Sequence, residues 1–422
     1  MHLLFENLVP NMVKHWTGDF KGLDKGTGTY RISKAQWMMV GLLTAWATRT
    51  IPSVFVGTLP DIAQDQSLFK AEAYSFWIQY LAPILLKDVM PRKYYNHVLA
   101  LREIILLCLQ FKITRIEVDE LQAMINNWVL KYEMYYYQYQ TSRLPTCPLT
   151  IHALLHIPYY ILRTGPLWAS WAFVMERFCG RLLPAVRNRT RPYIQLDNYI
   201  KRRAQLQLVA KKYDIPTLTK AYVKPSHPNE VQMSTQEIAY PQFDTIVLGR
   251  PIHYKVTLDK VLKKQLIGYF NLVYPGRKPQ DHVNSIDAGS LIRQYDLCPD
   301  QYASFSSRRD RPIREVQYGR LHNIYYVEYI EPGDGKREPY LLARVTECVT
   351  GGIDASRRGT PLVTYNQELD PSIIHLKTIV AVIGRVHLGG KEWAIVDRSR
   401  DGARTQFLDG DGNVDHDVDD RS

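Results

Sequence analysis

The chain has 422 residues, of which 45% are hydrophobic and 23% are charged. This composition excludes a disordered polymer and leaves room for about two or three domains with their own cores. The net charge of +11 favours a polyanionic partner, and nucleic acid is the commonest one. Ordinary basic surface for solubility is the alternative. The longest apolar stretch, 37–46, is about half of the ~20 residues that a membrane span requires, so we expect no membrane-spanning segment.

Residues 1–213 are predicted to be mostly helical. The chain opens on an amphipathic helical pattern with no N-cap before it, so we expect part of the machinery to lie upstream of Met1. Further helices are predicted after Phe69, over 95–111 and from Thr114. Thr114 and Glu117 have capping-box spacing, which marks the start of the clearest helix. This half of the chain therefore predicts a helical domain.

Two groups of side chains in this half have the residue types of a binding site. The tyrosines at 132, 135–137 and 139 can stack on bases, but aromatic residues at helical spacing more often pack in a core. His152 and His156 are four residues apart and share a helix face, a spacing that can hold zinc. No third ligand is evident, so we favour packing of the two rings against a turn.

The pattern changes beyond residue 213. Prolines punctuate a polar stretch over 214–243, which is typical of a linker. Runs of β-forming residues around turn sequences predict two hairpins, over 325–345 and 380–396, within a β-rich domain that spans 244–408. The last residues, 409–422, are acidic and are predicted to be a disordered tail. The predicted fold class is α+β, with a small β-rich barrel or sandwich after the helical half.

Three stretches of the helical half together resemble one protein family. They are MHLLFENL with WTGDFKGLD (1–8 and 16–24), CPLTIHALLH (147–156), and GPLW, MERFCG, LPA and RNR (165–168, 175–180, 183–185 and 187–189). In this order they resemble the Tnp2-type transposases of CACTA (En/Spm) DNA transposons, in the form found in fungal genomes. The resemblance covers about residues 1–213. The segments YGR (318–320) and VIGRV (382–386) resemble, less specifically, the β-rich module that often follows in such proteins.

The resemblance implies a DDE-type transposase with an RNase H-like core, of which residues 1–213 would be the insertion and the C-terminal piece. Such enzymes hold two Mg²⁺ or Mn²⁺ ions with three carboxylates and cut and join DNA strands. By this resemblance Glu176 corresponds to the third acidic residue, a catalytic and metal-binding position. The first two acids would lie before Met1, so we expect this chain by itself to hold no metal and to be inactive. A purely structural glutamate is the alternative.

The segment after Glu176 is strongly basic. From Glu176 to Lys224 the sequence holds twelve Lys or Arg residues against three acids. Such a segment contacts phosphates with strong, salt-dependent and sequence-independent affinity, whereas the alternative is a solvated helix face. The residues expected to bind nucleic acid are Arg177, Arg181, Arg187, Arg189, Arg191, Lys201, Arg202 and Arg203.

The function expected from the residues and the resemblance together is that of a transposon-derived, DNA-binding remnant of a cut-and-paste transposase, located in the nucleus. Its expected partners are DNA, through the backbone phosphates, and a second copy or a full-length transposase. The alternative hypothesis is a DNA- or chromatin-binding or interaction protein without catalysis.

Overall fold

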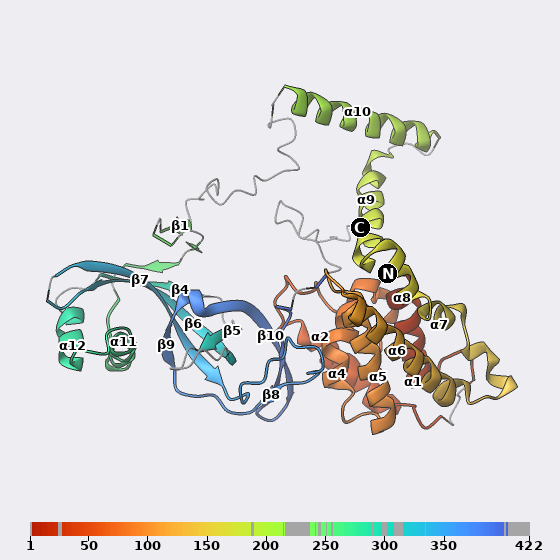
Figure 1. The fold of residues 1–422 in the computed structure, drawn as a ribbon, viewed down its shortest axis with the longest axis horizontal. Coiled ribbons are helices and arrows are strands. Elements are labelled where there is room, and N and C mark those ends of the chain that lie inside the picture. Colours follow the sequence, from red (N-terminus) through yellow and green to blue (C-terminus); the bar gives the residue numbers. More distant parts are fainter. Residues whose placement is uncertain are drawn as a thin grey trace.

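The computed structural model describes residues 2–23, 28–186, 190–213, 215, 237–240, 242–243, 246–249, 251–254, 256–287, 291–297, 302–307, 315–333, 335–400 and 402–403. The fold is α+β, as the sequence predicts. Helices make up the N-terminal half, and an antiparallel sheet dominates the C-terminal part (Figure 1). None of the described helices is both long and apolar enough to cross a bilayer.

The N-terminal half consists of α-helices joined by short 3₁₀ and π segments. The α-helices are α1 (Val9–Thr17), α2 (Lys34–Ala47), α3 (Ala71–Phe76), α4 (Ala82–Leu85), α5 (Arg92–Cys108), α6 (Arg115–Tyr132), α7 (Leu149–Leu154), α8 (Ile157–Thr164), α9 (Phe173–Leu182) and α10 (Pro192–Lys212). The connecting segments are η1 (His2–Leu8), η2 (Gln66–Leu68), η3 (Trp77–Leu81), η4 (Glu133–Tyr137), η5 (Thr141–Thr146), η6 (Leu167–Ala169) and η7 (Leu183–Ala185).

The predicted capping box at the start of α6 is confirmed. The backbone N–H of Thr114 donates to Glu117 Oε2 over 2.7 Å, and the N–H of Glu117 donates to Thr114 Oγ1 over 3.3 Å. These bonds favour the charged carboxylate, so the pKa of Glu117 is lowered. Two of the unpaired N–H groups at this end of the helix are thereby satisfied, and the boundary of α6 is fixed by local chemistry.

The core of the helical half is built from large aromatic side chains. Trp16, Trp128, Tyr132 and Tyr136 are all at most 1% exposed. Trp16 Nε1 donates to the Tyr136 hydroxyl over 3.1 Å, so the buried phenol has a partner. The tyrosine stripe therefore packs in the core at Tyr132 and Tyr136, which confirms the preferred interpretation and removes these two rings from any stacking surface.

The C-terminal part contains nine strands in one sheet, a separate two-stranded sheet, and two helices, all within the described residues. The helices are α11 (Lys260–Val273) and α12 (Pro279–Asp287). The strands are β1 (Glu237–Ala239), β2 (Val247–Gly249), β3 (Ile252–His253), β4 (Leu291–Asp296), β5 (Tyr302–Ser307), β6 (Glu315–Ile330), β7 (Arg337–Cys348), β8 (Thr364–Tyr365), β9 (Ser372–His375), β10 (Ile379–Gly389) and β11 (Glu392–Val396).

Both predicted hairpins are present. β6 pairs with β7 in antiparallel register from Ile330↔Arg337 to Tyr318↔Cys348, and β10 pairs with β11. Of the two predicted architectures, the barrel is not correct, because the sheet does not close within the described residues. Its path runs β3-β4-β6-β5-β10-β11-β8, and β7 pairs with β6 on one side and with β9 on the other. β9 and β10 follow each other through η10 (Leu376–Thr378), and no pairing between them occurs in the described residues. Strand β1 also begins within the stretch that the sequence predicts to be a linker, and it pairs with β2.

The sheet contacts the helical half through β10, beside the end of α2. The backbone N–H of Arg385 donates to the Thr50 carbonyl over 3.1 Å, and Thr50 Oγ1 donates back to the Arg385 carbonyl over 2.6 Å. A Cβ atom at Gly384 would lie 3.1 Å from Ile51 Cγ1, so only glycine allows this close approach without displacement. Val386, Ala394 and Val396 belong to the same buried cluster as the helices. We call this contact the junction.

Candidate nucleic-acid interface

The predicted basic segment begins on α9. Glu176, Arg177 and Arg181 lie on this helix, but their side chains fall outside what the structure describes, and Arg187 and Arg189 lie outside the described residues altogether. The start of α9 is anchored, because the ring of Phe173 lies 6.4 Å from that of Phe5 in the core. The backbone of α9 therefore carries the first part of the basic segment away from a fixed point on the helical body.

The second part of the basic segment is α10. Arg191 occupies its N-cap position, and Lys201, Arg202 and Arg203 lie near its middle. Arg191, Lys201 and Arg202 are exposed, whereas Arg203 is half-buried. Lys201 Nζ lies 2.6 Å from Asp197 Oδ2, so an acid of the same helix partly neutralises this lysine. The helix itself holds five Lys or Arg residues against this single acid.

The two sides of α10 differ in burial. Its less exposed residues, Leu196, Tyr199, Arg203 and Ala210, are three to seven positions apart and therefore lie on one face. Lys201 and Lys212 lie on the opposite face, and Arg202 lies on a flank between the two faces. Large apolar residues of α10 are also exposed, among them Tyr193 at 83%, Leu208 at 67% and Ile194 at 55%. The exposed surface of α10 is thus both basic and apolar.

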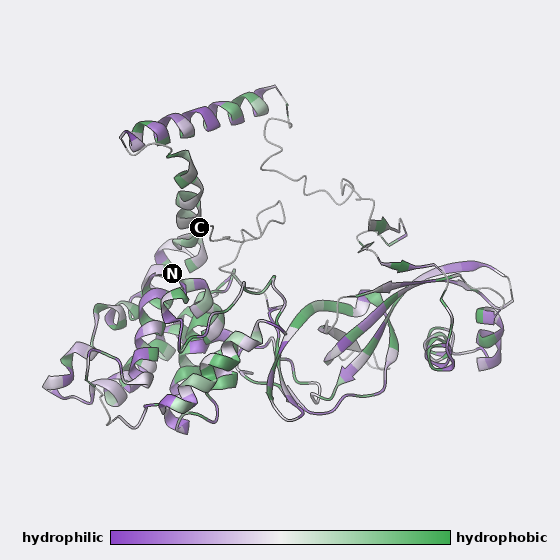
Figure 2. Cartoon of the chain, turned by 180° about the vertical axis from the view of Figure 1, so that it is seen from behind, coloured by the Kyte–Doolittle hydropathy of each residue, from purple (hydrophilic) through white to green (hydrophobic). Residues whose placement is uncertain are grey.

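α9 and α10 project from the helical body (Figures 1 and 2). Figure 2 shows polar and apolar residues alternating along α10. At 21 residues the helix is about 32 Å long, which matches roughly nine base pairs of duplex DNA. The helix therefore presents its cations along a length comparable to one turn of DNA.

The implied two-metal centre does not fit the described residues. Three carboxylates are needed to hold two ions, and no group of three or more His, Cys, Asp or Glu side chains that could hold a metal occurs among the residues that the structure describes. Glu176 is the one predicted ligand on this chain. We therefore derive no catalytic step for it.

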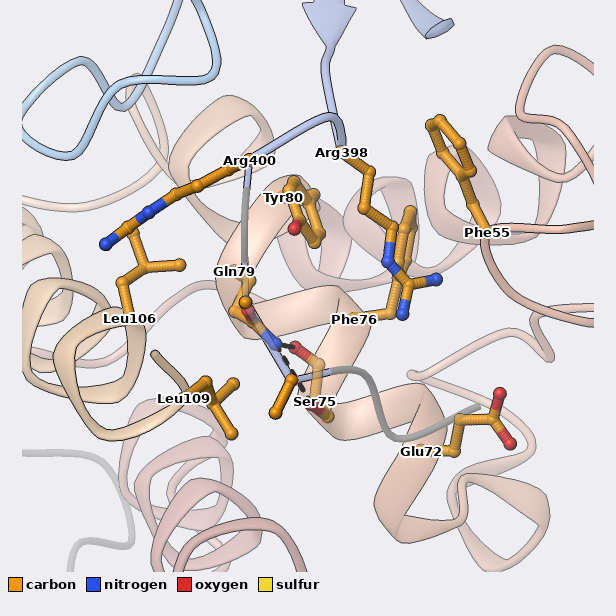
Figure 3. A pocket seen from close by; sticks show the side chains of 12 residues that line it. Phe55, Glu72, Ser75, Phe76, Gln79, Tyr80, Leu106, Leu109, Arg398 and Arg400 are labelled. Atoms are coloured by element: carbon orange, nitrogen blue, oxygen red, sulfur yellow. Dashed lines mark hydrogen bonds between the residues drawn. The ribbon is translucent and has the colours of Figure 1, made fainter. Parts of the chain in front are cut away.

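A small pocket lies in the helical half, where the chain after β11 crosses α3, η3 and α5 (Figure 3). Its free volume of about 30 Å³ has room for about two water molecules and none for a nucleotide. The Arg398 side chain lies beside Phe76, with its guanidinium carbon 6.0 Å from the ring centre, and Arg400 points in another direction. The two arginines do not converge on a common point, so the pocket is not an anion site.

The prediction for His152 and His156 is wrong in one respect. The two residues do not share a helix face, because His152 lies on α7 and His156 lies in the turn that precedes α8. Both side chains are exposed and contact each other. Tyr193 is a further candidate contact residue, and its position two residues after Arg191 at the start of α10 is the signal for it in the sequence.

Comparisons of the chain with models of known protein families, with curated proteins and with solved structures find no match.

Proposed function

We propose that this protein is a transposon-derived DNA-binding protein, a remnant of a DDE-type cut-and-paste transposase that acts in the nucleus and is catalytically inactive as this chain. The transposase ancestry, and with it the RNase H-like origin of residues 1–213, rests on the motif resemblance. The observation that carries DNA binding is the projecting helix α10 with its exposed cations. The resemblance assigns one metal-binding acid of this chain, Glu176, and this supports inactivity, since one carboxylate does not hold two Mg²⁺ or Mn²⁺ ions.

The proposed binding mode is contact with backbone phosphates. Exposed cations lie along α10 from Lys201 to Lys212, and Arg191 at its N-cap adds a guanidinium that can bridge two phosphate oxygens. Affinity of this kind depends steeply on salt and little on sequence, because each contact releases condensed counterions.

The test compares two triple variants of the full chain that lose the same charge. The first is Arg191→Ala, Lys201→Ala and Arg202→Ala. The control is Lys260→Ala, Lys264→Ala and Lys391→Ala, three exposed lysines of the sheet part of the chain. Binding to several unrelated duplexes is measured by fluorescence anisotropy at a series of salt concentrations. The first variant should lower the slope of log affinity against log salt by about 2 to 3, and the control should leave it unchanged.

Equal slopes for both variants would place the DNA contact elsewhere. Weakened binding to one duplex only would indicate base readout in place of phosphate contact. A wild-type chain that binds none of the duplexes at low salt would refute the proposed function.

A second candidate function, as an interaction protein, is favoured by the exposed apolar residues of α10. Tyr193, Ile194 and Leu208 lie beside the cations, and large apolar residues grouped on one surface are typical of protein contacts. The partner under this hypothesis is a second copy or a full-length transposase. Sedimentation of the chain without DNA tests it, since a Tyr193→Ser, Leu208→Ser variant should then lose self-association.

A further inference from the structure

We propose that His152 and His156 form a two-ligand site for a divalent transition metal ion of the kind that imidazole prefers, such as Zn²⁺ or Ni²⁺. The site is independent of the proposed DNA contact and of the carboxylate centre that the resemblance implies. It uses two neutral imidazoles, with water completing the coordination shell.

The geometry of the two rings carries the proposal. Their Nε2 atoms lie 3.1 Å apart, and the rings are steeply inclined at 76°. With metal–nitrogen bonds of about 2.0–2.1 Å, two nitrogens at this separation subtend an angle of about 100° at the metal. That angle lies between those of octahedral and tetrahedral coordination, so an ion can bind both nitrogens with little movement of either ring.

The backbone that carries the rings is held in place. His152 lies on α7, and His156 occupies the N-cap position of α8, so the pair spans the corner between two short helices. Leu154 and Ile157 on the inner side of this corner are buried at 0% and 6% exposure. The rings therefore project from a fixed corner into solvent, where an ion can reach them.

The chemistry of the contact also favours a cation. In the described part of the chain, the one hydrogen bond of each ring is the bond to the other ring, so no third group competes with an ion for the Nε2 atoms. Without a metal, one Nε2 must carry a proton and donate it to the other. With a metal, both rings hold their proton on Nδ1, and both Nε2 lone pairs bind the ion. Because this requires neutral rings, acid should release the metal.

The test uses untagged full-length protein with His2→Gln, because an amino terminus followed by histidine can itself chelate metal. Zn²⁺ and Ni²⁺ are titrated into it by calorimetry. The variants are His152→Gln and His156→Gln, and the control is His387→Gln, an exposed histidine whose ring contacts the Gly390 carbonyl. Circular dichroism checks that every variant is folded.

We expect one ion per chain, with affinity reduced about tenfold or more by loss of either ring and unchanged in the control. Binding should disappear on acidification, and Zn²⁺ should raise the melting temperature of the parent protein and of neither variant. Absence of saturable binding would overturn the site and leave the contact as a hydrogen bond between two imidazoles. Equal affinity in either single variant would also overturn it, because a chelate needs both rings. Neither result would affect the DNA-binding proposal.

Discussion

Replacing His97 should change how the stability of the protein depends on pH. The His97 ring is 1% exposed and stacks on Trp128, with ring centres 4.5 Å apart and planes 8° from parallel. His97 Nε2 lies 3.1 Å from the Trp128 carbonyl oxygen and donates to it, while Trp128 Nε1 donates to the His97 carbonyl over 3.0 Å. The other ring nitrogen, Nδ1, is buried and has no hydrogen-bond partner among the described residues. A second proton there would add a buried charge with no acceptor.

Burial accordingly lowers the pKa of His97 from 6.5 to about 4 in the folded protein. In the unfolded chain the ring takes up a proton below about pH 6.5, whereas the folded protein does so only near its lowered pKa. Unfolding therefore takes up a proton between these values, and the free energy of unfolding decreases as the pH falls through this window. The difference between the two pKa values corresponds to a total decrease of about 3 kcal/mol in the free energy of unfolding, which is complete by about pH 4.

The comparison is with His97→Phe, which keeps a ring against Trp128 and does not titrate. At pH 7.5 the variant should be less stable by about 1 kcal/mol, because the Trp128 carbonyl loses its donor. Urea unfolding at intervals from pH 7.5 to 4 should show that the wild type has the larger free energy of unfolding at pH 7.5 and the smaller one at pH 4. Subtracting the variant removes the contributions of His282, His322 and His375, whose pKa values are also lowered. A difference between the two proteins that stays constant with pH, or a His97 proton resonance that titrates near pH 6.5, would refute this reasoning.

Four further outcomes are expected. The guanidinium carbon of Arg385 lies 4.0 Å from the ring centre of Tyr302 and 3.7 Å from that of Trp393. Arg385→Met should therefore lower the free energy of unfolding, measured by chemical denaturation, by about 3 kcal/mol. The exposed control Arg337→Met should change stability by less than about 0.5 kcal/mol. Gly384→Ala should lower the free energy of unfolding by about 1–3 kcal/mol in the same assay, because the added methyl group crowds Ile51. An unchanged free energy of unfolding would mean that the junction can relax around the methyl group. Purified protein should not nick supercoiled plasmid with Mg²⁺ or Mn²⁺, and nicking that Glu176→Ala abolishes would contradict the proposed inactivity. Limited proteolysis should cut first within 216–236, and early cleavage of α5 or β6 instead would argue against a linker there.

The sequence predicts most reliably what is decided locally. Thr114 and Glu117 mark the start of α6 because the capping box is closed within four residues. The β6–β7 hairpin is predictable because its turn residues and alternating strands are adjacent in the chain. The junction was not predictable, since Thr50 and Arg385 are separated by 335 residues and nothing in either segment indicates the other. The failure of the sheet to close has the same origin, because closure depends on pairing between distant strands.

The charge of the candidate site could be predicted from the sequence, but its shape could not. The excess of Lys and Arg after Glu176 indicates a phosphate-binding segment, and α10 does carry exposed cations. Its projection from the body depends on which tertiary contacts α9 and α10 make, and no local pattern encodes these. The close approach of the His152 and His156 Nε2 atoms depends on the bend between α7 and α8, whereas the spacing alone indicated only a shared face.

The junction also determines what a break in the chain would do. The contact between Thr50 and Arg385 closes a loop of more than 300 residues. A second contact joins the two halves, because the N–H of Ala403 donates to the Leu109 carbonyl. While the chain is intact, the two halves meet at the high effective concentration that a covalent tether provides. Cleavage within 216–236 would remove the tether and leave the contact surfaces in place. The halves would then stay together at high protein concentration and separate on dilution, so a nicked protein would behave as a reversible heterodimer of its own fragments.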